Sequence, residues 1–234
     1  MKSIAAVTTM GLATLSVGLL LVGCSSATKT EKTETASTSA SVVASSSPVP
    51  ATSATPASGA AMTINEYITK NNIAETPFKK DQPGTPKIDF PFPPDWSLAG
   101  DKTPDWAYGA IIYDKPQDPN DPPYMYAIAS KLTGNVDAAK ILEYAPNQLM
   151  ALPDYKPVTE PTKTSLSGFD AIQSAGTYTK DGKQRIAAQK TVVVPAKDGL
   201  FVLQINADAI DGQQGVIIDA ANLIDEKTKI TPPA

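Results

Sequence analysis

The chain has 234 residues, with 20 Lys and Arg against 24 Asp and Glu, no His and a single Cys. The net charge of −4 and the lack of a basic cluster argue against nucleic acid as a partner. Because His is absent and Cys occurs only at position 24, Ser-His-Asp and Cys-His catalysis are excluded, as are the usual zinc and copper sites. We therefore expect no cofactor, no bound metal and no disulfide.

The first 23 residues have the pattern of a secretory signal peptide. Lys2 precedes an apolar stretch from about Ile4 to Leu21, and the run Leu21-Val22-Gly23-Cys24 has the form of a bacterial lipobox. Cleavage between Gly23 and Cys24 would make Cys24 the new N-terminus, with a diacylglycerol on its thiol and often an acyl chain such as palmitate on its amine. An uncleaved transmembrane anchor is the alternative, since about 20 apolar residues suffice to span a bilayer. The Gly and Ser that follow, in place of a basic stop-transfer cluster, favour the lipoprotein.

Residues 24–61 are predicted to be a disordered tether. They are rich in Ser, Thr, Pro and Ala and contain no aromatic residue, so they cannot bury enough surface to offset chain entropy. A random coil of this length spans on the order of 30 Å. Two or three acyl chains on Cys24 would give stable anchoring. We expect a lipid-anchored protein on the extracytoplasmic face of the cell membrane.

Residues 62–234 have the size of one globular domain. The run Thr63-Ile64-Asn65-Glu66 is a capping box and predicts a helix with Tyr67 and Ile68 buried beside Ile64, ending at Asn71-Asn72. The alternation of Ile88, Phe90 and Phe92 predicts a strand with one buried face. Its prolines, at 91 and 93, place it at a sheet edge or a frayed strand end.

Two more strands are predicted over residues 106–113 and 124–130, joined by a stiff polar loop over 115–123. A helix follows from Asp137 to about Leu152, and Pro146 is expected to kink it or to end its first half.

The C-terminal part is predicted to consist of hairpins and a final helix. Apolar runs over 169–178, 184–194 and 200–206 are joined by Asp181-Gly182 and Asp198-Gly199, a strong hairpin signal because both turn residues need positive φ. The last helix is expected over about 213–226, and its inward side chains are Val216, Ala220, Leu223 and Ile224. This order predicts an α+β fold, with a mostly antiparallel sheet of about six to seven strands flanked by about three helices.

Three segments carry a family resemblance: TINEYI at 63–68, FPFPPDW at 90–96 and IASKL at 128–132. Together with the lipobox and tether they resemble the mycobacterial LpqN/LpqT lipoprotein family, over the whole chain. The resemblance implies a PsbP-like α-β-α sandwich and a role in cell-envelope biogenesis. It also implies binding of trehalose-linked mycolate glycolipids and contact with the mycolate exporter or mycolyltransferases. It brings no catalytic motif.

Four aromatic residues could line an apolar pocket in which tryptophan rings stack on sugars: Phe90, Phe92, Trp96 and Trp106. Burial in the core is the alternative, and alternation favours it for the two phenylalanines. Each tryptophan follows a Pro-Asp pair at the end of a loop, where binding residues are common. We therefore take Trp96 and Trp106 as candidate ligand-binding residues, with packing as the competing interpretation.

Acidic side chains provide two weaker hypotheses. The loop residues Asp114, Asp118, Asn120 and Asp121 could hold calcium, but they lack the spacing of an EF-hand, and solvated loop acids are favoured. Carboxylate pairs such as Glu66 with Glu75, or Asp208 with Asp211, could support glycosidase chemistry only at a suitable separation.

The sequence therefore favours a non-enzymatic, membrane-anchored binding module for an envelope glycolipid. A protein–protein adaptor for membrane export or transfer proteins is the alternative, and a carboxylate-based enzyme is a third hypothesis. An open pocket would support the binding module, whereas a closed core with an exposed apolar patch would support the adaptor.

Overall fold

The computed structural model describes residues 61–233. Gly23, Cys24, the predicted signal peptide and nearly all of the predicted tether lie outside the described residues. Among the residues that are described, no helix is long and apolar enough to cross a membrane.

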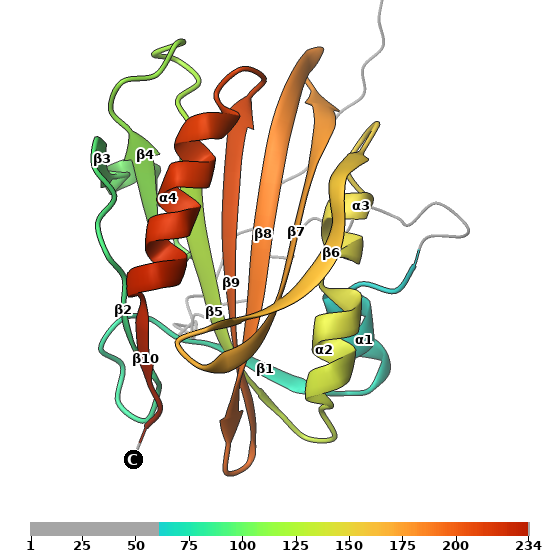
Figure 1. Cartoon of the computed structure of the whole chain (residues 1–234). Coiled ribbons are helices and arrows are strands. Elements are labelled where there is room, and N and C mark those ends of the chain that lie inside the picture. Colours follow the sequence, from blue (N-terminus) through green and yellow to red (C-terminus); the bar gives the residue numbers. More distant parts are fainter. Residues whose placement is uncertain (1–60, 234) are drawn as a thin grey trace, which may run out of the picture. The chain divides into compact units, whose positions relative to one another are not determined.

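Eight strands form one antiparallel sheet in the order β3-β4-β5-β9-β8-β7-β6, and β1 also pairs with β5 (Figure 1). Their bounds are β1 Ala74–Pro77, β3 Trp96–Leu98, β4 Gly109–Tyr113, β5 Tyr124–Thr133, β6 Lys156–Leu166, β7 Phe169–Lys180, β8 Lys183–Ala196 and β9 Gly199–Ile210. A separate two-stranded ladder joins β2 (Lys87–Asp89) to β10 (Lys229–Thr231). The predicted α+β class and the mostly antiparallel sheet are confirmed.

The helices cover the two faces of the sheet separately. They are α1 Ile64–Lys70, α2 Ala138–Tyr144, α3 Asn147–Met150 and α4 Gln214–Lys227, with a short 3-10 turn at Gly100–Lys102. On one side, Ile217 and Ile224 of α4 pack on Leu203 of β9; we call this the α4 face. On the other side, Ile64 and Ile141 pack on Val202; we call this the α1 face. Alternate side chains of each strand therefore belong to two different cores.

The predicted ends of two helices are confirmed. The Thr63 hydroxyl accepts from the Glu66 N–H, and the Glu66 carboxylate accepts from the Thr63 N–H at 2.8 Å. This backbone hydrogen bond holds the pKa of Glu66 below its ordinary value. Pro146 is the N-cap of α3 and separates it from α2, because a proline inside a helix removes a hydrogen bond.

Two-residue turns set the register of the long hairpins. Asp181 and Gly182 have φ of 52° and 73°, as the predicted turn requires. The β8–β9 turn differs by one residue from the prediction: Ala196 pairs with Gly199, so Lys197 and Asp198 form the loop. Gly199 instead begins β9 with a φ of 150°.

Several predicted strands and faces need correction. The strand at residues 88–92 ends at Asp89, because Pro91 and Pro93 have no N–H to extend the ladder, and Phe92 is 55% exposed. The strand predicted to start at 106 begins at Gly109 instead.

In α4 the buried residues are Ile217, Ala220 and Ile224, while Val216 and Leu223 are only half-buried. The sequence reading missed β1, β3, β6 and β10; β6 lacks a signal because nearly all of its side chains are exposed.

We predict that Gly199→Ala lowers the free energy of unfolding by about 2–4 kcal/mol. A Cβ at this position would overlap the carbonyl oxygen of Leu132, and a φ of 150° strains any residue with a side chain. Gly215→Ala, on α4 where a Cβ meets nothing within 4 Å, is the matched control and is expected to be neutral or stabilising by a few tenths of a kcal/mol. Urea denaturation measures both. Equal effects at the two positions would contradict the steric account.

Candidate ligand-binding site

Two hollows lie on the α4 face, one on each side of α4. The hollow on the β4 side measures about 500 Å³, and the one on the β6 side about 240 Å³. Met125 and Ile205 of the sheet and Ile224 of α4 line both of them, so the two hollows adjoin at the buried contact between the helix and the sheet. We call them the apolar groove and the polar pocket, after the side chains described next.

The apolar groove runs between α4 and β4. Tyr108 and Phe90 meet edge to face along one wall, with ring centroids 6.3 Å apart, and Ile111 continues the lining. Phe92 and Leu98 stand at the groove with 55% and 72% of their surface exposed. Large apolar side chains held in the open beside a cavity are typical of a site that receives an apolar ligand.

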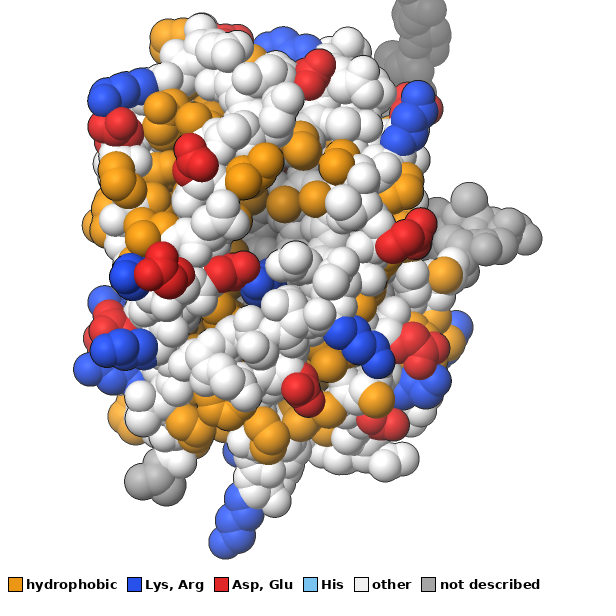
Figure 2. Space-filling model, viewed as in Figure 1, with side chains coloured by type: hydrophobic (Ala, Val, Ile, Leu, Met, Phe, Trp, Pro, Cys, Tyr) orange, Lys and Arg blue, Asp and Glu red, His pale blue; other side chains and the backbone are white. Residues whose placement is uncertain are grey.

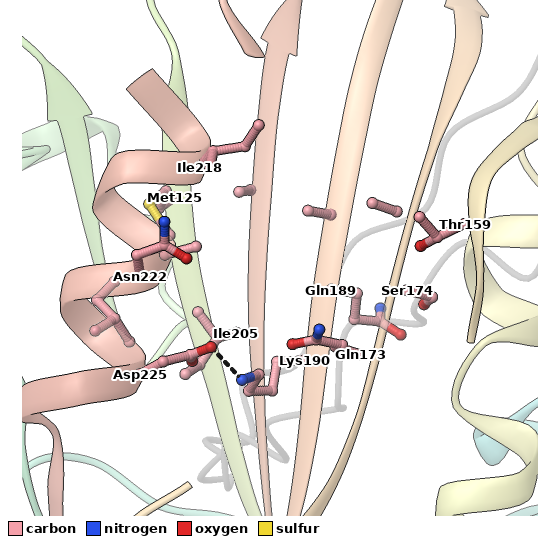
Figure 3. Close-up of a pocket in the computed structure, with 15 residues that line it drawn as sticks. Met125, Thr159, Gln173, Ser174, Gln189, Lys190, Ile205, Ile218, Asn222 and Asp225 are labelled. Carbon is pink, nitrogen blue, oxygen red and sulfur yellow. Dashed lines mark hydrogen bonds and ion pairs between the residues drawn. The ribbon is translucent and has the colours of Figure 1, made fainter. Parts of the chain in front are cut away.

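The polar pocket lies between α4 and β6 (Figure 3). At its base the strands present only the short side chains of Ala175, Ala188 and Ala207, which leaves the pocket open above them. Hydrogen-bonding side chains reach it from four elements: Thr159 of β6, Gln173 of β7, Lys190 of β8, and Asn222 and Asp225 of α4. The space-filling view shows the surface hollowed at this place (Figure 2).

One ion pair ties α4 to the sheet inside the polar pocket. Lys190 Nζ lies 2.5 Å from Asp225 Oδ2, with the Lys190 side chain only 9% exposed and that of Asp225 37% exposed (Figure 3). An ammonium group at this depth needs its partner, because an unpaired buried charge is strongly unfavourable. Since the two charges cancel, the pocket offers donors and acceptors without a net charge.

The shape of β6 opens the polar pocket. Its pairing with β7 has two register shifts, between Pro157 and Thr159 and between Thr159 and Thr162. Bulges of this kind bend a strand and increase its twist. Figure 1 shows β6 curving across the α4 face, and Figure 3 shows Thr159 on the side of the pocket opposite α4.

The structure does not bring the two candidate tryptophans together. Trp96 is 5% exposed and packs on Tyr113, with ring centroids 5.7 Å apart, so packing explains its position. Trp106 is 55% exposed and lies against Tyr126 of the α1 face. Neither lines the apolar groove or the polar pocket.

The loop acids are largely engaged by neighbouring side chains. Asp121 accepts from Arg185 at 2.7 Å, Asp118 lies 3.4 Å from Lys183, and Asp114 accepts from Ser97. Across residues 61–233 no group of three or more Asp, Glu, His or Cys could hold a metal ion.

One carboxylate of each suggested acid pair has a structural partner. Glu66 caps α1. Asp208 accepts from the Tyr178 hydroxyl and from the Arg185 guanidinium. Burial, and then the hydrogen bond to Asp208, raise the pKa of Tyr178 far above its ordinary value.

Sequence reasoning missed the polar pocket because its residues come from four separate elements. The one signal was Lys190, a charge inside the apolar run from Ile186 to Val194. Phe90 and Phe92 were named as possible pocket residues, although the alternation favoured burial in the core.

The antiparallel sheet with helices on both of its faces defines an α+β domain, and the apolar groove and the polar pocket beside α4 are its candidate binding sites. The family model described as "Probable lipoprotein LpqN" matches residues 60–231, and the chain belongs to this LpqN lipoprotein family. The resemblance noted in the sequence is thereby confirmed.

One relative and one solved structure match over most of the chain. Lipoprotein LpqN of Mycobacterium tuberculosis (strain ATCC 25618 / H37Rv) is 49% identical over 176 residues, which cover 75% of this chain and 77% of that protein. The crystal structure of LpqN involved in cell envelope biogenesis of Mycobacterium tuberculosis superposes with a TM-score of 0.71 at 49% identity. That match covers 74% of this chain and all of the solved chain.

We predict that Asp225→Ala destabilises the domain by about 1–3 kcal/mol, because Lys190 is left buried and unpaired. Lys190→Met removes the charge and keeps the length of the side chain, so its cost should stay below about 1 kcal/mol. Thermal and urea unfolding of both variants measure the difference. A larger loss for Lys190→Met would contradict this account of the ion pair.

Asp121 should make stability depend on pH in the acid range. The hydrogen bond from Arg185 holds the pKa of this carboxyl below its ordinary value of 3.8. The carboxylate therefore stabilises the fold above that pH, and this contribution is lost as the pH falls through the folded-state pKa. We expect Asp121→Asn to be less stable by about 1–3 kcal/mol at pH 7, with the deficit shrinking below about pH 3.8. A deficit that stays constant from pH 7 to pH 2 would contradict this.

Proposed function

We propose that this chain is a lipid-anchored, extracytoplasmic binding module that holds an amphipathic glycolipid of the cell envelope and performs no chemistry on it. Membership of a lipoprotein family supports the anchor, and the lipobox sequence supports Cys24 as its position. The solved relative is described as involved in cell envelope biogenesis, which supports the compartment and the process.

The adjoining position of the two hollows carries the proposal. Met125, Ile205 and Ile224 line both the apolar groove and the polar pocket, so the hollows lie on either side of one buried contact, and we place the apolar and polar parts of one ligand in the two of them. An acyl chain fits the groove, where each buried methylene contributes about 0.8 kcal/mol. Sugar hydroxyls fit the pocket, where Gln173 and Asn222 supply amide donors and acceptors.

A neutral head group suits the pocket better than a charged one. Its two charged side chains, Lys190 and Asp225, neutralise each other at 2.5 Å. A phosphate or carboxylate would have to compete with Asp225 for Lys190. A trehalose-linked mycolate combines an uncharged disaccharide with long acyl chains, and we propose this type as the ligand.

The predicted tether gives the domain reach over the membrane surface. Residues 24–61 would let a domain anchored at Cys24 collect a lipid from one membrane protein and present it to another. We propose the mycolate exporter and mycolyltransferases as such partners. Because Phe92 and Leu98 are exposed at the groove, an adaptor that docks on these proteins through this surface is the second candidate.

The test uses residues 61–234, since the core clusters of the structure lie within this part and the solved relative spans it. Phe92→Ser and Leu98→Ser should each weaken binding of a short-chain trehalose monoester by about 10-fold, from the lost apolar contact. Both residues are largely exposed, so unfolding should change by less than about 0.5 kcal/mol. Met150→Ser, an exposed apolar residue of α3 at 45%, is the matched control and should bind as the parent does. Calorimetric titration measures the affinities.

Two results would separate the hypotheses. Saturable binding of the monoester that only the groove variants weaken supports the binding module. No binding of the monoester by well-folded protein would contradict it. Copurification of envelope proteins that Phe92→Ser abolishes would then support the adaptor.

A further inference from the structure

A third hollow lies on the α1 face, on the other side of the sheet from α4. It measures about 260 Å³ and is lined by α1, β1, β5, β9 and the turn that carries Trp106. Ile128 and Val202 form apolar parts of its lining, and Gln204 lies beside them on β9. Neighbouring residues of a strand point to opposite faces, so this hollow is separated from the glycolipid site by the thickness of the sheet.

An unpaired hydroxyl lies at the floor of this hollow. Ser130 of β5 is only 4% exposed, and its Oγ has no hydrogen-bond partner among residues 61–233. A buried hydroxyl without a partner is unfavourable, and the great majority of such groups in folded proteins are hydrogen-bonded. Ser130 therefore has the capacity to donate one hydrogen bond and to accept others from a group that enters the hollow.

Trp106 is exposed but held in place. It lies in the turn Pro104–Ala107, which is closed by a 2.9 Å hydrogen bond from the Ala107 N–H to the Pro104 carbonyl. The ammonium of Lys79 donates to the carbonyls on both sides of Trp106, those of Asp105 and Ala107. An exposed ring on a fixed backbone loses little conformational entropy when a ligand binds to it.

The ring itself is also supported. Trp106 meets Tyr126 edge to face, with ring centroids 5.5 Å apart and planes at 79°. An edge-to-face contact covers only part of the Trp106 ring, and 55% of the Trp106 surface remains exposed. A large flat apolar surface is thus presented beside hydrogen-bonding groups.

The polar groups around the hollow are mostly neutral. Gln204 donates to Gln148 at 3.0 Å, and both amides line the hollow with Asn65 and Ser130. The one charged side chain in the lining is the carboxylate of Glu75. An anion would be repelled by Glu75, whereas hydroxyl groups can donate to it.

We propose that this hollow is a second binding site, which takes a neutral hexopyranose ring stacked on Trp106 and hydrogen-bonded to Ser130. The apolar C–H face of the sugar lies on the indole, and its hydroxyls reach the Ser130 hydroxyl, the amides and Glu75. The ligand class is a neutral sugar or one ring of a neutral oligosaccharide. This site does not rest on the glycolipid proposal, because it shares no residue with the apolar groove or the polar pocket.

The two tryptophans make the test direct. In residues 61–234, acrylamide should quench Trp106, which is exposed, much more than Trp96, which is 5% exposed. Glucose, mannose or trehalose should protect Trp106 from quenching in a saturable way, with a dissociation constant on the order of 1 mM. Glucuronate, which carries a carboxylate, should protect it more weakly. No protection by any of the neutral sugars would overturn the proposal.

Ser130→Ala separates binding from structure. Removing an unpaired buried hydroxyl should leave stability unchanged or raise it, while sugar affinity falls by about 3- to 10-fold. Trp106→Ala should abolish binding measured by calorimetry. Phe92→Ser, on the apolar groove, is the matched control and should bind the sugar normally, although it binds the trehalose monoester more weakly. Unchanged affinity in Ser130→Ala, or loss of sugar binding in Phe92→Ser, would overturn the assignment to this hollow.

Discussion

A single helix is too narrow to cover one face of this sheet. The seven-strand path from β3 to β6 is about 29 Å wide at about 4.8 Å between strands, whereas a helix with its side chains is about 10–12 Å wide. One helix laid on the α4 face must therefore leave open floor on both of its sides. The apolar groove and the polar pocket are the result of this mismatch, and their shared lining at Met125, Ile205 and Ile224 is the part that α4 covers.

Two contacts decide where α4 lies on the sheet. Ile217, Ala220 and Ile224 pack its buried stripe on the strands, and the Lys190–Asp225 ion pair adds a polar tie between the helix and β8. Where the helix does not cover the sheet, β7, β8 and β9 present alanines, whose short side chains leave the pocket open. The same residues that position the helix thus shape the cavity in which we place the ligand.

Local signals in the sequence predicted local structure well. Thr63 with Glu66 begins α1, Pro146 ends α2, and Asp181-Gly182 forms its turn, because each depends on hydrogen bonds or backbone angles within a few residues. Strand β6 was missed because exposed side chains give no alternation.

Sites built from distant residues could not be predicted in this way. Trp96 and Trp106 share the same Pro-Asp context, yet one is buried against Tyr113 and the other is exposed. Their burial depends on strand pairing, which periodicity does not specify. The polar pocket likewise joins β6, β7, β8 and α4, so its residues are neighbours only in the folded chain.

The most direct test of the glycolipid site is a methyl NMR titration of residues 61–234 with a short-chain trehalose monoester. The account predicts saturable shifts at Met125, Ile205 and Ile224, which line both hollows, and at Ile111 in the apolar groove. The methyl groups of Ile141 and Val193, in the core of the α1 face, should stay unshifted. Shifts confined to the α1 face, or none at all, would contradict the placement of the glycolipid in the two hollows beside α4.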